Sequence, residues 1–70
     1  MENLLQKRVG KRIKEIRVEK KISQQELADL CGFEPSNMSR LEAGRANATL
    51  STLEAVSKNL GVEVIDLFKF

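Results

Sequence analysis

The sequence contains no histidine, tryptophan or tyrosine and has a single cysteine. Without histidine, the usual base that activates a serine or cysteine nucleophile is missing. The acidic residues are scattered along the chain, whereas a metal site needs clustered ligands. The four glycines stand alone, so there is no glycine-rich phosphate loop. We therefore expect neither an enzyme nor a protein with a metal, a cofactor or a small-molecule ligand.

Long apolar runs are also missing from these 70 residues. None approaches the roughly 20 residues that a membrane-spanning helix needs. The N-terminal segment lacks the order of a signal peptide, because its charges follow the apolar pair and no long apolar core comes next. One cysteine forms no internal disulfide, and a reduced intracellular setting is then the default. We expect a single domain over residues 1–70, located in the cytoplasm without membrane contact.

Charge is unevenly spread, although the formal net charge is only +2. From residue 1 to residue 21, eight basic and three acidic residues give +5; the remaining four basic and seven acidic residues give −3. The basic residues of this N-terminal segment form either the solvated face of an amphipathic helix or a surface that attracts phosphates.

Local signals predict five helices and no strand. The first helix starts at Asn3, because Asn3 and Gln6 have the spacing of a capping box, and it ends near residue 19 or 20. Its apolar stripe consists of Leu5, Val9, Ile13 and Ile16. Gly10 interrupts good helix formers, which indicates the close approach of a neighbouring helix.

The clearest helix start lies at Ser23. Ser23 and Glu26 have the S-x-x-E spacing of a capping box, and Ile22 and Leu27 are placed to form a hydrophobic staple. Gly32 predicts that this second helix ends in a left-handed conformation.

A third helix follows after a very short turn. Pro35 suits the first helical position, Glu34 stands at its cap, and Gly44 supplies the stop. The outward side chains are those of Ser36, Asn37 and Arg40. Two helices joined this tightly form a helix-turn-helix over residues 23–44, whose second helix, 35–43, can enter the major groove of DNA.

The C-terminal part predicts two more helices. After a polar loop over residues 45–48, Thr49 caps a fourth helix that ends at Gly61. Residues 63–68 predict a short fifth helix, and the alternative, a strand, would have no partner. Cys31 falls on the inward face of the second helix, where a free cysteine is a small apolar residue; redox sensing or metal binding is the alternative. The predicted fold is all-α and compact.

The combined pattern resembles the phage-repressor and Cro-like helix-turn-helix family, also called xenobiotic-response-element type regulators. The resemblance rests on SQQELADLCGFEPSNMSRLEAG followed by TLSTLEAVSKNLGV, and it covers about residues 10–68. It implies a compact five-helix repressor-like DNA-binding domain with its helix-turn-helix at helices two and three. Among small members, it is similar to the controllers of restriction-modification operons, to Cro-like repressors and to some antitoxins, and the sequence does not choose among them.

The resemblance also implies roles for particular residues. The positions that face bases hold Pro35, Ser36, Asn37 and Arg40. The positions that contact DNA phosphates hold Gln24, Arg45 and Asn47. Arg17 and Glu42 match a pair that forms an internal salt bridge in many members.

The chemistry of two base-facing residues is specific. Arg40 suits guanine O6 and N7, and Asn37 suits adenine N6 and N7. The alternatives are a surface ion pair of Arg40 with Glu34 or Glu42, and local capping by Asn37.

Two residues depart from the family pattern. Lys21 stands where members often have glycine, so either the first helix ends differently or a left-handed lysine carries a small cost. Glu34 stands where members often have serine or threonine, and we expect it to tune specificity or cap the helix rather than add affinity.

These observations predict a sequence-specific, double-stranded DNA-binding transcriptional regulator. Because one helix buries little surface on DNA, we expect a homodimer on a pseudo-palindromic operator. Candidates for the dimer contact are Val64, Ile65, Phe68 and Phe70, although a frayed tail is the alternative for Phe70. Competing functions are a protein-interaction module or antitoxin-type partner-binding domain with the same fold, and membrane-surface binding by the basic first helix.

Overall fold

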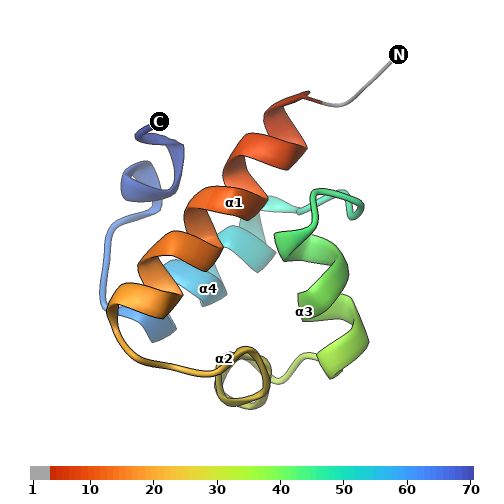
Figure 1. Ribbon diagram of the computed structural model, residues 1–70, viewed down its shortest axis with the longest axis vertical. Helices are drawn as coiled ribbons and strands as arrows, with labels where there is room; N and C mark the ends of the chain where they lie inside the picture. Colours follow the sequence, from red (N-terminus) through yellow and green to blue (C-terminus); the bar gives the residue numbers. More distant parts are fainter. Residues whose placement is uncertain (1–3) are drawn as a thin grey trace.

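The computed structural model describes residues 4–70, which form helices around an apolar core. The elements are α1 (Leu4–Glu19), α2 (Gln24–Cys31), α3 (Pro35–Glu42), α4 (Leu50–Leu60) and the 3-10 helix η1 (Val64–Phe68). Figure 1 shows α1 crossing in front of α4, with α3 beside them and α2 below. The described residues contain no strand, which confirms the all-α prediction.

The first helix presents most of its predicted stripe to the core. The buried members are Val9, Ile13 and Ile16. Leu5 is 55% exposed, so the stripe prediction is wrong there. At Gly10, an added Cβ would lie 2.4 Å from the carbonyl oxygen of Leu41 in α3, which confirms the predicted close approach of a helix. The predicted cap at Asn3 lies outside the described residues.

The second helix starts and ends as predicted. The Glu26 N–H donates to Ser23 Oγ and the Ser23 N–H donates to Glu26 Oε1, both at 3.0 Å. The backbone N–H of Ser23 favours the charged carboxylate, and the pKa of Glu26 is therefore lowered. Gly32 has a φ of 73°, as predicted. Lys21 has a φ of 59°, so the left-handed lysine is the alternative that the structure adopts before this helix.

The last helical segment corrects the predicted helix count. Residues Val64–Phe68 form a 3-10 helix, so the described chain has four α-helices rather than five. The Asp66 N–H donates to the Glu63 carbonyl oxygen at 3.0 Å, and the Asp66 side chain accepts from the Glu63 N–H at 2.9 Å. A segment of five residues closes too few i→i+4 bonds to favour an α-helix over the tighter turn.

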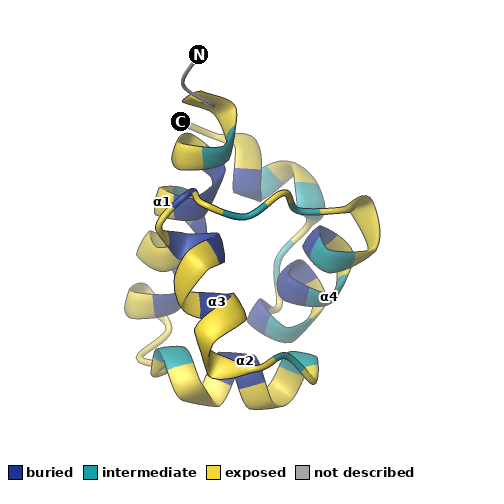
Figure 2. Cartoon of the chain, turned by 90° about the vertical axis from the view of Figure 1, so that its right-hand side faces the viewer, coloured by how far each residue is buried: buried dark blue, intermediate teal, exposed yellow. Residues whose placement is uncertain are grey.

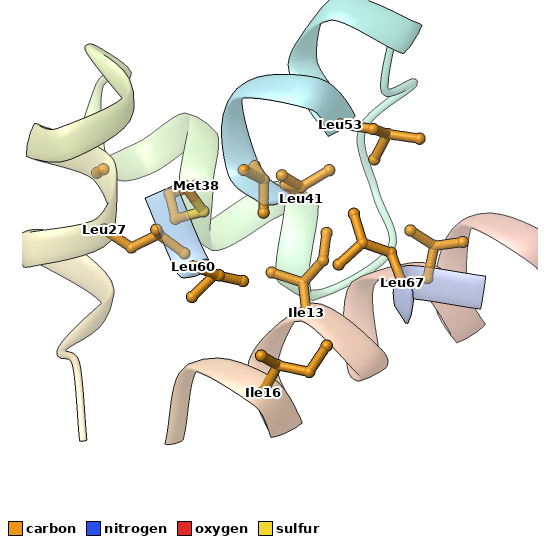
Figure 3. Packing of buried hydrophobic residues seen from close by; sticks show 11 residues of the cluster. Ile13, Ile16, Leu27, Met38, Leu41, Leu53, Leu60 and Leu67 are labelled. Carbon is orange, nitrogen blue, oxygen red and sulfur yellow. The ribbon is translucent and has the colours of Figure 1, made fainter. Parts of the chain in front are cut away.

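The core joins all five elements. Its fully buried side chains include Ile13, Leu27, Met38, Val56 and Leu67. Figure 3 shows Ile13 of α1, Leu41 of α3 and Leu67 of η1 converging in one cluster. The core thus anchors the inner face of α3 and leaves its outer face to solvent.

Candidate nucleic-acid interface

The α2–turn–α3 unit holds α3 at the surface of the molecule. The Phe33 N–H donates to the Ala28 carbonyl oxygen at 2.8 Å across the turn. Pro35 occupies the start of α3, and Glu34 is its N-cap residue. This confirms the predicted cap position of Glu34, although its side chain makes no cap hydrogen bond.

The outer face of α3 carries the polar side chains predicted to face bases. Pro35, Ser36, Asn37 and Arg40 are all exposed, whereas Met38 and Leu41 point into the core. Figure 2, which looks directly at this side, shows α3 as an exposed ridge above α2. The face is therefore open to a partner along its length.

The local alternatives for two of these side chains are not realised in residues 4–70. Arg40 forms no ion pair with Glu34 or Glu42 there, and the Glu42 carboxylate is already engaged by Arg17. The Asn37 side chain makes no hydrogen bond within the same residues. Both side chains keep their donors available to a group outside the chain.

A concave surface brings predicted base-facing and phosphate-contacting residues together. This reading pocket has a volume of about 490 Å³ and lies between α3, the loop after it and the start of α4. The predicted residues that line it are Asn37, Arg40, Arg45 and Asn47. The pocket therefore presents amide and guanidinium donors on both of its sides.

Sequence reasoning missed the other walls of the reading pocket. They are formed by Phe33, Leu41, Ala46, Ala48 and Thr52. Two of them, Ala46 and Ala48, are small loop residues whose type alone carries no signal of that role. Only the packing of α3, the loop and α4 around the pocket identifies these walls.

Arg17 and Glu42 lie together in a buried ion pair. Arg17 Nε donates to Glu42 Oε2 at 2.7 Å, and Arg17 Nη2 donates to Oε1 at 3.0 Å. A third donor, Arg17 Nη1, reaches the Ile22 carbonyl oxygen at 2.8 Å in the turn before α2. The two-bond fork ties the end of α1 to the end of α3.

Gln24 also belongs to this network. Its Nε2 donates to Glu42 Oε1 at 3.0 Å, so the first residue of α2 is linked to the last residue of α3. Its half-buried side chain has one amide N–H directed to a carboxylate and only the other left for a DNA phosphate. The sequence offered no signal for this link, because the partners are 18 residues apart.

The loop residues Arg45 and Asn47 are both exposed, but their surroundings differ. Asn47 Oδ1 accepts a hydrogen bond from Gln6 Nε2 in α1, which leaves the Asn47 amide N–H groups as donors toward solvent. Arg45 makes no side-chain hydrogen bond or ion pair within residues 4–70. Gln6 was expected only as a partner of Asn3, so its link to the loop was missed.

Cys31 sits at the edge of the core between α2 and α4. Its Sγ lies 3.8 Å from the Ala55 carbonyl oxygen and 3.7 Å from Asn59 Nδ2. Burial raises the pKa of the Cys31 thiol, so it is protonated at neutral pH and is a poor nucleophile. Within residues 4–70, no three His, Cys, Asp or Glu side chains gather as a metal site, and no helix is apolar and long enough for a bilayer.

The predicted dimer candidates divide into two groups. Val64 is half-buried and packs against the core, whereas Ile65 is 65% exposed. Phe68 and Phe70 are exposed, and the Arg8 guanidinium lies 5.6 Å from the centre of the Phe70 ring. This cation–π contact gives Phe70 a partner on α1 instead of a frayed position.

Comparison with known proteins agrees with this geometry. A family model described as "Helix-turn-helix" matches residues 13–67. The immunity repressor protein of Bacillus phage phi105 is 46% identical over 56 residues, which are 80% of this chain but only 39% of the repressor. The control protein C.BamHI of Bacillus amyloliquefaciens is 35% identical over 71 residues, covering 100% of this chain and 88% of the control protein.

One solved structure is also similar to this chain in sequence and in fold. The restriction-modification controller protein C.Esp1396I, determined as a tetramer in complex with its natural 35 base-pair operator, matches with a TM-score of 0.87 and 32% identity. The match covers 97% of this chain and 90% of that chain. The family model, these relatives and the fold together show that the chain belongs to the helix-turn-helix family in which phage repressors and restriction-modification controllers are found.

Proposed function

We propose that this protein is a sequence-specific, double-stranded DNA-binding transcriptional regulator that acts as a homodimer. One observation carries the proposal: α3 exposes Asn37 and Arg40 with free donors, over a reading pocket that also contains Arg45 and Asn47. The complex of the similar controller C.Esp1396I with its operator supports the same use of this fold.

The base-reading step belongs to α3. When α3 lies in the major groove, the Arg40 fork pairs with guanine O6 and N7, and the Asn37 amide pairs with adenine N6 and N7. Ser36 adds a less selective hydrogen bond, and Pro35 offers only apolar contact with a thymine methyl. These contacts supply sequence preference.

Phosphate contacts hold α3 in register. Arg45 supplies positive charge at the loop, and Asn47 supplies an amide donor whose orientation Gln6 fixes. Gln24 offers its remaining N–H at the start of α2, where backbone N–H groups also point outward. The carboxylate of Glu34 disfavours phosphate nearby and accepts from cytosine N4 if a cytosine is present.

A homodimer follows from the small size of one reading helix. Two copies on half-sites about one helical turn apart double the contacts and read a pseudo-palindrome. Ile65, Phe68 and Phe70 supply exposed apolar surface near the C-terminus. We place the regulator in the cytoplasm, as a single domain over residues 1–70.

The competing function is a protein-interaction module or an antitoxin-type partner-binding domain. Such a role favours acidic or apolar residues on the outer face of α3. The observed face is polar and basic at Asn37 and Arg40, which favours DNA.

Selection of bound sequences from a random DNA pool, with sizing of the complex by light scattering, tests the proposal. We expect one enriched pseudo-palindrome bound by two copies of the chain. The matched control carries Asn37→Ala and Arg40→Ala, which change exposed side chains and leave the core intact. Enrichment of no sequence by the wild-type protein, with a folded circular dichroism spectrum, would contradict the proposal.

A further inference from the structure

The two flanks of α3 are formed by different elements. The reading pocket, with Arg40 and Arg45, lies on the flank toward α4. The first helix forms the other flank, and Figure 2 shows α1 and α4 on opposite sides of α3. A helix in the major groove has a phosphate strand near each of its flanks. Arg45, the proposed phosphate contact that carries a charge, faces one of these strands.

One face of α1 packs against the last turn of α3. Gly10 lies against the carbonyl oxygens of Leu41 and Glu42, with no room between them for a Cβ. Farther along α1, Arg17 forms its two-bond fork with the Glu42 carboxylate. These contacts fix which side of α1 is turned toward α3.

Lys14 shares this face of α1. It comes four residues after Gly10 and three residues before Arg17, and both spacings place side chains on one side of a helix. Lys14 is exposed, and it makes no hydrogen bond or ion pair within residues 4–70. Its ammonium group is therefore an uncommitted cation beside α3.

The two polar side chains that hold this flank together offer less to a phosphate. The donors of Arg17 are taken up by Glu42 and by the Ile22 carbonyl oxygen. Gln24 is neutral and directs one amide N–H to Glu42. A phosphate that approaches this flank therefore meets a full, unpaired positive charge at Lys14.

We infer that Lys14 contacts a phosphate of the strand that lies across the major groove from the one contacted by Arg45. This inference rests on the proposed DNA-binding function and adds a residue of α1 to its phosphate contacts. With Arg45 on one flank and Lys14 on the other, α3 has a cation facing each strand. The inference also divides the basic N-terminal segment, because Lys14 then attracts phosphate and Lys11 belongs to the solvated face.

Lys11 provides a matched control, because it is an exposed lysine on another side of the same helix. It lines a hollow of about 410 Å³ together with Arg8 and Phe70. Figure 1 shows the C-terminal segment and α3 on opposite sides of α1. Lys11→Gln and Lys14→Gln therefore change the net charge equally and alter different faces.

Titrations of a duplex with one selected half-site, at several salt concentrations, test the contact. We expect Lys14→Gln to lower the slope of log affinity against log salt by about 1, and the affinity about fivefold at about 0.15 M salt. Lys14→Arg should keep the wild-type slope. Lys11→Gln should keep it too, because salt screens a charge that makes no contact. Equal slopes for Lys14→Gln and Lys11→Gln would overturn the inference.

Base preference gives a second readout of the same variant. A phosphate contact carries no sequence information, so Lys14→Gln should weaken binding to every half-site sequence by the same factor. A loss confined to one base position would overturn the assignment of Lys14 to a phosphate.

Neutral methylphosphonate groups, placed one at a time in the half-site, identify the strand. The phosphate that Lys14 contacts is the one whose replacement weakens the wild type but not Lys14→Gln. We expect it on the other strand from the phosphate found in the same way with Arg45→Ala. One strand for both would overturn the inference and leave the proposed function intact. If the wild type bound no DNA, the proposed function and this inference would both fail.

Discussion

Arg17 and Arg40 differ in burial and therefore in what their side chains can contact. Arg17 is 8% exposed, and its donors are taken up by Glu42 and the Ile22 carbonyl oxygen. Arg40 is exposed and forms no ion pair within the described residues. The guanidinium chemistry is identical, so the fold alone decides that Arg17 supports α3 and that Arg40 keeps its donors exposed.

Replacing Arg40 with alanine should relax the preference for one base pair in each half-site. The lost bidentate contact corresponds to about 1–3 kcal/mol of discrimination. Competition binding against operators mutated at each position measures this loss. Arg45→Ala serves as the control, because a phosphate contact carries no base preference. An unchanged preference profile for Arg40→Ala would remove Arg40 from the base-reading residues.

Arg17→Met should destabilise the fold by about 3–5 kcal/mol, because it leaves the buried Glu42 carboxylate without its main partner. Urea denaturation followed by circular dichroism measures the change. The double variant with Glu42→Leu should recover much of the loss, since no unpaired charge then remains buried. If the single variant were as stable as wild type, the pair would contribute nothing to folding.

Local chemistry explains which side-chain contacts were predictable. The capping bonds between Ser23 and Glu26 join neighbours three residues apart, so sequence alone predicts them. The links from Gln24 to Glu42 and from Gln6 to Asn47 span 18 and 41 residues. Such links depend on how helices pack, and neither propensity nor spacing encodes that packing.

At the scale of elements, the four α-helices were predictable because each has local start or stop signals. Thr49 accepts a hydrogen bond from the Thr52 N–H at 3.1 Å, and Gly61 ends the same helix with a φ of 73°. The 3-10 form of η1 was not predicted, since apolar spacing over five residues does not separate two helix types. The loop over residues 45–48 has no regular pattern, and only its packing shows that it lines the reading pocket.

Gly10→Ala should lower stability by about 1–3 kcal/mol, even though alanine favours helices by about 1 kcal/mol over glycine. The new methyl group would meet the Leu41 and Glu42 carbonyl oxygens at 2.4 and 2.8 Å, so α1 and α3 must separate. Thermal denaturation checks this result, with the exposed Lys11→Ala as a control in the same helix. A raised melting temperature for Gly10→Ala would show that α1 and α3 separate at little cost in free energy.

The whole molecule has a basic N-terminal segment and an acidic remainder, yet its reading pocket is basic. Residues 22–70 contain only four basic residues, of which Arg40 and Arg45 line that pocket. Half of the basic residues in this segment therefore lie where α3 is exposed. The net charge of +2 conceals this arrangement.

Salt dependence should distinguish the phosphate contacts that we propose for Arg45 and Gln24. Each lost cation lowers the slope of log affinity against log salt by about 1, so Arg45→Ala should flatten the slope. Gln24→Ala removes a neutral donor that also binds Glu42, so it should weaken binding and leave the slope unchanged. Titrations of the selected operator at several salt concentrations give both slopes. A flatter slope for Gln24→Ala would contradict the assignment of Gln24 as a neutral residue that positions the helices.

The attachment of α3 has a thermodynamic consequence. Its last turn is held by Arg17, by Gln24 and by the backbone contact at Gly10, so its orientation is fixed before DNA arrives. The conformational entropy of ordering α3 is therefore lost during folding. When α3 docks on DNA, the further loss of conformational entropy falls mainly on exposed side chains such as Arg40. We therefore expect binding to behave as the association of two preformed surfaces, with a heat-capacity change that reflects the apolar area buried at the contact.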